Sequence, residues 1–176
     1  MKFTPTPIPG VVRVDPEPQT DERGSFARIY CEATFRAHGL ESVGIQCNIS
    51  VNAKRGTVRG LHYQAPPAEE AKLVRCVRGR LFDVAVDLRP DSPAFRRWFA
   101  IELDAERGEA LYIPRGCAHG FLTLADDTAV YYHMGAEYAP DLARGVRWND
   151  PAFAIAWPFA PLHISPRDAA FPDFAP

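Results

Sequence analysis

The sequence predicts an all-β fold of two antiparallel sheets, a double-sheet jelly roll with one or two short helices. Hydrophobic residues alternate with a period of two in several short runs, and turn signals separate these runs. Residues 81–88 are the clearest case, because Phe82 and Val84 fall on one face of the expected strand while Leu81 and Asp83 fall on the other. Such spacing is typical of an antiparallel sandwich or barrel.

The predicted elements follow one another with short connections. Strands are expected at residues 11–14, 45–51, 72–78, 81–88, 98–103, 110–113, 120–124 and 129–134, and a further strand-like run leads to His62. The only helical pattern is at residues 32–38, an amphipathic stretch followed by Gly39 in the position of a C-cap glycine. Many of the 17 prolines lie in residues 5–18 and 151–176. These segments are therefore expected to be extended terminal arms on the core or on a partner subunit.

Length, charge and cysteine content restrict the class of protein. A chain of 176 residues with 47% hydrophobic content has the size of one domain, so residues 1–176 are expected to form a single domain. The formal charge of −2 argues against nucleic acid as a partner. Four cysteines without a CxxC pair, and no secretion leader, favour a reduced, cytoplasmic protein. No apolar run approaches the roughly 18 residues of a membrane span.

One strand-like run carries the densest set of functional groups. His62 lies at its end, Gln46, Asn48 and Arg59 precede it, and Lys72 follows ten positions later. A neutral imidazole beside fixed cations is what an enzyme needs to remove a proton next to a carbonyl in an anionic substrate. Because Arg59 and Lys72 would repel each other in one cavity without an anion between them, a ligand site is favoured over a structural histidine.

A metal site is the second hypothesis. Residues 114–119 have the P-x-G-x-x-H form of the second cupin motif, in which His119 is either a site residue or a turn histidine. The first cupin motif should supply H-x-H and a carboxylate, whereas this chain has His62-Tyr63-Gln64. Glu69 and Glu70 are interpreted as residues of a solvated loop. Two histidines and one glutamate are a poor ligand set for a transition metal, so no metal is expected.

Several motifs occur in one unbroken order. They are DERGSF (21–26), QCNIS (46–50), RGLHYQ (59–64), AKLVRC (71–76), FDVAVDLR (82–89), SPAF (92–95), IPRGCAHGF (113–121), EYAP (137–140) and WNDP (148–151). Together they resemble the dTDP-4-dehydrorhamnose 3,5-epimerase family of nucleotide-sugar epimerases over roughly residues 10–170. The resemblance implies a cupin-like jelly roll and a homodimer with exchanged N-terminal strands. It also implies epimerisation of a 4-keto-6-deoxyhexose on a nucleoside diphosphate, without metal or organic cofactor.

The resemblance implies a role for each catalytic candidate. His62 would be the base, Lys72 would lie by the ketone oxygen and favour the enolate, and Tyr132 would deliver a proton from the opposite face. The carboxylate that orients His62 would come from the C-terminal arm, where Asp168 is the counterpart. Asp83, on the inward face of its predicted strand, is the competing partner of His62.

The resemblance also assigns residues to the diphosphate. Arg23 and Arg59 would contact it, because a planar guanidinium offers paired donors to phosphate oxygens, and Arg167 would add a third cation. Phe26, in the same motif as Arg23, belongs to the substrate-binding set implied by the resemblance.

The nucleotide base and the sugar complete the implied substrate site. Tyr138 would stack on the base, while Gln46 and Asn48 would read its edge. His119 would lie in the sugar pocket, either bonding to the substrate or supporting the base. The structural alternative for Gln46 and Asn48 is that they satisfy strand or turn groups.

Two positions differ from the family pattern. Arg28 and Ala143 stand where the family has glutamates. Because a change from acceptor to donor at Arg28 alters what can be recognised there, the base of the nucleotide stays open between thymidine and others such as cytidine or guanosine. The alternatives to 3,5-epimerisation are inversion at a single centre, C3 or C5, and a non-catalytic or metal-binding cupin.

Overall fold

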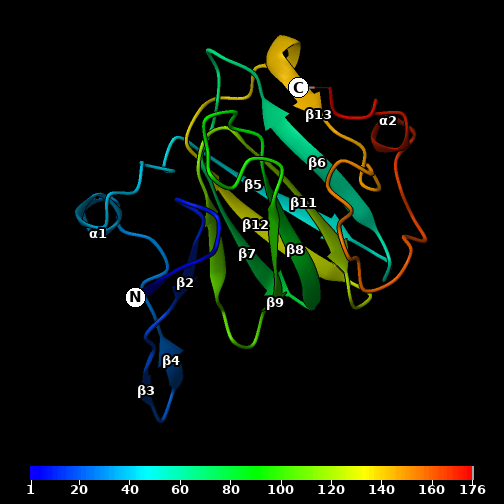
Figure 1. Cartoon of the computed structure of the whole chain (residues 1–176). Coiled ribbons are helices and arrows are strands. Elements are labelled where there is room, and N and C mark those ends of the chain that lie inside the picture. Colours follow the sequence, from blue (N-terminus) through cyan, green and yellow to red (C-terminus); the bar gives the residue numbers. More distant parts are fainter. Residues whose placement is uncertain (176) are drawn as a thin grey trace.

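The computed structural model describes residues 1–175 and confirms the predicted all-β double-sheet jelly roll (Figure 1). Its strands are β1 (Lys2–Pro5), β2 (Val12–Asp15), β3 (Gln19–Asp21), β4 (Gly24–Phe26), β5 (Gln46–Asn52), β6 (Val58–Gln64), β7 (Lys72–Arg78), β8 (Arg80–Asp87), β9 (Trp98–Asp104), β10 (Ala110–Ile113), β11 (Cys117–Thr123), β12 (Thr128–Met134) and β13 (Ala143–Gly145). Its helices are α1 (Glu32–Ala37), α2 (Pro166–Ala169) and a 3-10 turn at Pro140–Leu142. No helix within residues 1–175 is long and apolar enough to cross a bilayer.

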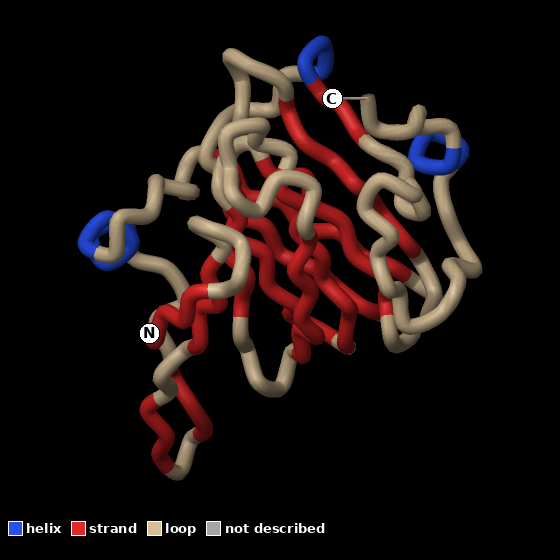
Figure 2. The backbone as a smooth tube through the Cα atoms, viewed as in Figure 1, coloured by secondary structure: helices blue, strands red, loops and turns tan. Residues whose placement is uncertain are grey.

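Two antiparallel sheets form the body of the molecule. The larger one has the strand order β1-β2-β10-β7-β12-β5, and the smaller one has the order β13-β6-β11-β8-β9. Strands β3 and β4 pair only with each other, and their hairpin projects away from both sheets (Figures 1 and 2). Strand β5 is therefore left as one edge of the larger sheet.

Most predicted elements are found, and the differences have local causes. Strands β7 and β10 begin and end at the predicted residues. Strand β11 begins earlier than predicted, at Cys117, because Cys117, Ala118 and His119 lack the β-branched side chains that mark a strand in sequence. Helix α1 is confirmed, and Gly39 follows it with a φ of +73°. The sequence shows a helical pattern only at residues 32–38, so it does not predict α2, which is four residues long.

The N-terminal arm is extended as expected, but it contains more regular strand than the one predicted at residues 11–14. Strands β1 and β2 pair with each other, and β2 also pairs with β10, so residues 5–18 contribute to the larger sheet. Pro5 ends the edge strand β1, where a missing N–H costs no ladder hydrogen bond. The C-terminal arm is extended as expected and packs on the core through side chains such as Phe153 and Trp157.

Strand β8 shows how the two layers share the core. Leu81 and Ala85 face the larger sheet, where they pack in a cluster with Phe121 of β11. Val84 and Val86 point the other way and are covered by the C-terminal arm. The strand is thus buried on both faces, and each fully buried side chain of this size contributes about 1.5–3 kcal/mol relative to exposure.

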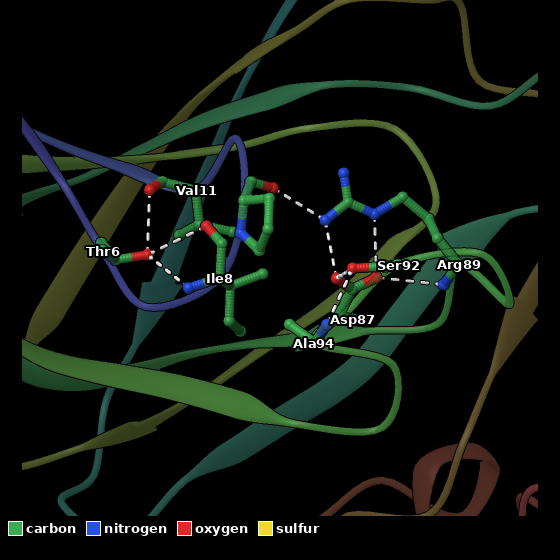
Figure 3. Close-up of polar contacts among 8 residues, drawn as sticks. Thr6, Ile8, Val11, Asp87, Arg89, Ser92 and Ala94 are labelled. Carbon is green, nitrogen blue, oxygen red and sulfur yellow. Dashed lines mark hydrogen bonds and ion pairs between the residues drawn. The ribbon is translucent and has the colours of Figure 1, made fainter.

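A polar cluster fixes the N-terminal arm to the end of β8 (Figure 3). Asp87 is fully buried and accepts hydrogen bonds from Arg89 Nε at 2.8 Å, Arg89 Nη2 at 2.7 Å and the Ser92 hydroxyl at 2.6 Å. Arg89 Nη2 also donates to the Pro9 carbonyl at 2.7 Å. Burial opposes ionisation of Asp87, but the hydrogen bonds from Arg89 and Ser92 outweigh it and hold the pKa of Asp87 below its usual value.

Replacing Arg89 tests this cluster. We expect Arg89→Met to lower the free energy of unfolding by about 3 kcal/mol, because a buried carboxylate loses its cation. Arg78→Met is the matched control, since the Arg78–Asp127 pair is exposed, with side chains 53% and 69% accessible, and should cost less than about 1 kcal/mol. Urea unfolding followed by circular dichroism measures both. Equal losses in the two variants would contradict the assignment.

The same cluster predicts a pH dependence of stability. Because the pKa of folded Asp87 is lowered, its contribution is complete above about pH 4, the ordinary range of an aspartate. The contribution is lost as the pH falls through the lower pKa of the folded state. We therefore expect the stability gap between wild type and Arg89→Met to close in acid, measured as the difference between urea midpoints at each pH.

Candidate active site

A pocket of about 300 Å³ lies between the two sheets. Strands β5, β7 and β12 of the larger sheet and β6 and β11 of the smaller one line it. Inward side chains of facing strands project into the same space because strand side chains alternate between the two faces. The predicted site residues that line the pocket are Asn48, Arg59, His62, Lys72, His119, Tyr132, Tyr138 and Arg167.

His62, on β6, pairs with Asp168 of α2, with 2.8 Å between His62 Nε2 and Asp168 Oδ1. The other oxygen of Asp168 accepts from the Gly60 amide at 3.1 Å. Burial opposes ionisation of Asp168, but the hydrogen bond and charge of His62, the Gly60 amide and the charge of Arg167 outweigh it, so the pKa of Asp168 lies below its usual value. An ionised carboxylate can only accept, so Nε2 carries the proton and Nδ1 is the basic nitrogen.

A second histidine–aspartate pair lies beside the first. His119 Nε2, on β11, is 2.7 Å from Asp83 Oδ1 on β8, and both side chains are buried. The sequence left Asp83 and Asp168 as competing partners of His62, and in the structure Asp168 contacts His62 while Asp83 contacts His119. His119 is a strand residue rather than a turn residue. In the antiparallel pairing of β11 with β6, His119 lies opposite His62.

Two glycines bring β6 and β11 close together at this point. Gly60 has a φ of +125°, and a Cβ built on it would lie 2.5 Å from the Gly120 Cα. Only a residue without a side chain fits such an approach in this backbone conformation. The two glycines therefore bring the strand segments that carry His62 and His119 side by side.

Lys72, on β7, forms a buried ion pair with Glu70. The distance between Lys72 Nζ and Glu70 Oε1 is 2.9 Å, and each side chain is 7% exposed. Lys72 Nζ also lies 3.4 Å from the His62 carbonyl oxygen. The interpretation of Glu70 as a solvated loop residue is wrong. The chain turns into β7 at this position, and Glu70 faces the same side as Lys72 two residues later.

Tyr132, on β12, lies across the pocket from the two histidines. Its ring centroid is 6.0 Å from that of His119. Burial and then the negative charge of Asp83 raise the pKa of Tyr132 far above its usual value, although the charge of Arg59 and a hydrogen bond with Ser50 act in the opposite direction. The phenol therefore keeps its proton at neutral pH. Tyr132 comes from the larger sheet and His62 from the smaller one, so they lie on opposite walls.

Polar groups continue from the pocket toward its rim. Arg59 Nε donates to Asn52 Oδ1 at 2.7 Å, which fixes the guanidinium on the pocket wall. Tyr138 is 55% exposed, and its amide donates to Gln46 Oε1 at 3.2 Å. Gln46 Nε2 in turn donates to Asn48 Oδ1 at 3.1 Å. These bonds leave the Tyr138 ring on the rim, where a flat ligand could stack on it.

Three predicted residues lie away from the pocket of their own chain, whereas Gln46 and Asp168 contact residues that line it. Arg23 and Phe26 lie on the β3–β4 hairpin, where Arg23 forms a two-pronged pair with Asp21 and Phe26 is 78% exposed. Arg28 follows the hairpin and is also exposed. Their predicted contact with substrate thus depends on something other than the fold of a single chain.

The sequence interpretation missed several groups in or beside the pocket. Gln64 and Glu70 each lie two residues from a recognised position, namely His62 and Lys72, and Asn52 lies four residues after Asn48 on β5. A strict period of two could have found them, since residues i and i+2 of a strand share a face. Arg144 gave no such signal, because it reaches the pocket only through the pairing of β13 with β6.

The groups around this pocket suit proton chemistry at carbon. His62 offers a basic nitrogen, Lys72 a buried ammonium and Tyr132 a protonated phenol. This set can remove a proton beside a carbonyl, stabilise the enolate oxygen and return a proton from the other side. Within residues 1–175, no group of three or more His, Cys, Asp or Glu side chains could hold a metal ion.

Comparisons with known proteins agree with this chemistry. A family model described as dTDP-4-dehydrorhamnose 3,5-epimerase matches residues 5–176. A dTDP-4-dehydrorhamnose 3,5-epimerase of Sinorhizobium fredii is 42% identical over 173 residues, covering 98% of this chain and 89% of that protein. An epimerase structure from Mycobacterium tuberculosis has a TM-score of 0.93 at 39% identity, covering 98% of this chain and 88% of that one.

A solved structure of a 3′-monoepimerase from Streptomyces bikiniensis in complex with dTDP-quinovose is also similar. Its TM-score is 0.89 at 37% identity, and the match covers 97% of this chain and 86% of that chain. The family predicted from the order of motifs is confirmed by a match over nearly the whole sequence and by the shared fold. The chain belongs to the dTDP-4-dehydrorhamnose 3,5-epimerase family and is an epimerase.

Proposed function

We propose that this protein inverts the carbons beside the C4 ketone of a dTDP-linked 4-keto-6-deoxyhexose, at C3, C5 or both, without metal or organic cofactor. One observation carries the proposal. The His62–Asp168 pair, 2.8 Å apart, and the protonated Tyr132 lie on opposite walls of one pocket. The Sinorhizobium fredii relative, a dTDP-4-dehydrorhamnose 3,5-epimerase at 42% identity, supports the choice of substrate.

The reaction begins with proton removal. Nδ1 of His62 takes the proton from C3 or C5, and the electrons of that C–H bond move to the C4 oxygen to form an enolate. The Lys72 ammonium donates to this oxygen, and losing such a preorganised donor typically costs about 3 kcal/mol in the barrier. Asp168 stabilises the imidazolium that forms on His62.

The second half of the reaction decides the stereochemistry. The Tyr132 hydroxyl gives its proton to the same carbon from the opposite face, the ketone re-forms, and the configuration is inverted. Although the pKa of Tyr132 is raised, an enolate carbon is more basic than a phenolate, so the transfer is favourable. Solvent then returns a proton to the phenolate and takes one from His62.

The nucleotide would occupy the outer part of the pocket. Tyr138 is on the rim and available for stacking, with Gln46 and Asn48 beside it. Arg59 and Arg167 also line the pocket, and their guanidinium groups suit a diphosphate.

Inversion at a single centre is the second candidate. Its support is the similarity to a 3′-monoepimerase, with a TM-score of 0.89 at 37% identity. The number of inversions depends on how long the enolate stays bound and whether the sugar ring turns over. Arg28 and Ala143, which depart from the family pattern, keep CDP and GDP sugars as alternatives to dTDP.

A homodimer would bring the β3–β4 hairpin to a pocket. The hairpin is exposed on all its residues, and an isolated two-stranded ribbon is only marginally stable in water. Strand β5 is an open sheet edge beside the pocket and exposes Ile49 and Val51, at 62% and 56%. A second copy placing its hairpin along β5 would cover this edge and bring Arg23 and Phe26 to the substrate of its partner.

A cytoplasmic location is part of the proposal. The cysteines Cys31, Cys47, Cys76 and Cys117 are all free thiols. Unpaired cysteines of this number are typical of a reducing compartment.

Hydrogen exchange at carbon tests the reaction. The protein is incubated with a dTDP-linked 4-keto-6-deoxyhexose in deuterated water with a chelator present, and label is located by NMR. We expect label at C3, C5 or both, which also counts the active centres. Repeating the assay with CDP and GDP forms identifies the preferred base. Absence of label with every substrate would reject the proposal in favour of a binding protein or a metal-dependent one.

Two variants separate the base from the acid. His62→Ala should lower exchange at every carbon by about 100- to 10,000-fold, whereas Tyr132→Phe should suppress completed inversion more than initial exchange. His163→Ala is the control, because His163 is an exposed histidine outside the pocket. Wild-type exchange in His62→Ala would overturn the assignment of the base.

Mixing inactive variants tests the exchanged hairpin. A dimer of one His62→Ala subunit and one Arg23→Ala subunit has one site with both native residues if the hairpin acts across the dimer. Random pairing should then restore roughly a quarter of wild-type activity, because half of the dimers are mixed and each has one complete site. If Arg23 acts within its own chain, the mixture should stay as inactive as its components.

A further inference from the structure

The proposed reaction gives no role to the buried carboxylate of Glu70, although it lies beside a catalytic group. Glu70 lies in the connection before β7, with a side chain only 7% exposed, and its carboxylate is 2.9 Å from the ammonium of Lys72. An ion pair this deeply buried gives little net stability, because the attraction between the charges is largely offset by the loss of hydration. Its presence beside the ketone-binding group therefore calls for another explanation.

The geometry of an ammonium group supplies that explanation. Lys72 Nζ has three N–H donors and no acceptor. One donor is directed at Glu70 Oε1 at 2.9 Å, and a second at the His62 carbonyl oxygen at 3.4 Å. With two of its donors directed at protein acceptors, the third N–H has a defined direction, and Lys72 lines the pocket. The lysine is thus a rigid donor instead of a mobile side chain.

Glu70 is itself held by a buried glutamine. Gln64 Nε2 lies 3.3 Å from Glu70 Oε2 and 3.2 Å from the Glu137 carbonyl oxygen, and Gln64 is 4% exposed. Gln64 Oε1 accepts from the Ala139 amide at 2.7 Å. Glu137 and Ala139 flank Tyr138, the residue on the rim. A continuous set of hydrogen bonds therefore joins residues 137–139, the Tyr138 loop, to Lys72.

We infer that Glu70 is a positioning residue, which aims the third N–H of Lys72 at the ketone oxygen, and that Gln64 ties this arrangement to the Tyr138 loop. The inference rests on the proposed epimerase function and adds a residue to it. Glu70 does not touch the substrate. It acts through Lys72, whose hydrogen bond is strongest when the oxygen becomes an enolate.

Neutralising Glu70 tests the inference. We expect Glu70→Gln to lower kcat for hydrogen exchange between about 10- and 100-fold, because a small misplacement of a catalytic group has this effect. KM should change less than about threefold, since the lost interaction belongs to the transition state. Glu69→Gln is the matched control. It makes the same change of charge at the neighbouring, partly exposed residue and should leave kcat and KM unchanged.

A double-mutant cycle separates positioning from a general structural effect. If Glu70 acts through Lys72, then Glu70→Gln should lower kcat less than about twofold further in a Lys72→Met background. Gln64→Met should lower kcat in wild type but have little effect in the Glu70→Gln background. Equal losses in both backgrounds, or a Glu70→Gln variant that behaves like Glu69→Gln, would overturn the inference while leaving the epimerase function intact.

Crystal structures test the same assignment without turnover. In Glu70→Gln we expect Lys72 Nζ to move out of hydrogen-bonding range of the His62 carbonyl oxygen, and in Glu69→Gln we expect it to stay. An unmoved, fully ordered Lys72 in Glu70→Gln would contradict the positioning role. This result does not depend on activity, so it would count even if the protein exchanged hydrogen in none of the sugars above. Circular dichroism and thermal unfolding verify that both variants are folded.

Discussion

Pairing of buried charges is the constraint on which this protein depends. A cavity between two apolar sheets cannot hold an isolated charge, because removing an ion from water costs several kcal/mol. Here His62 contacts Asp168, His119 contacts Asp83 and Lys72 contacts Glu70. Each pair solves the same physical problem, and each also fixes a side chain that could act on a substrate. Both the stability of the fold and the orientation of the catalytic groups therefore require a charged partner at these positions.

The partners come from distant parts of the chain. Asp168 arrives on a one-turn helix in the C-terminal arm, 106 residues after His62, whereas Asp83 comes from the strand next to His119 in the sheet. The arm that covers the outer face of β8 therefore also completes the orientation of the histidine. The same segment therefore covers part of the core and supplies the carboxylate that orients His62.

The hairpin that carries Arg23 and Phe26 contributes neither to the two main sheets nor to the pocket of its own chain. It projects from the body, whereas the pocket lies between the sheets beside the open edge of β5. An exposed hairpin and an exposed sheet edge are both costly to leave in water, and a second copy would cover the two together. In the proposed dimer, the diphosphate would contact Arg59 and Arg167 of one subunit together with a hairpin from the other, while the proton chemistry would belong to each subunit.

Much of the fold could be foreseen from local order in the chain. Strands such as β7 and β10 were predicted to the residue, because alternation reports directly on a pleated backbone. The motifs likewise pointed to His62, Lys72 and Tyr132 as neighbours in one pocket. Local order could not choose between Asp83 and Asp168, recognise Glu70 as buried, or show that Arg23 lies away from its own pocket. These outcomes depend on strand register and on the path of the terminal segments through space, and no pattern of neighbouring residues encodes such distances.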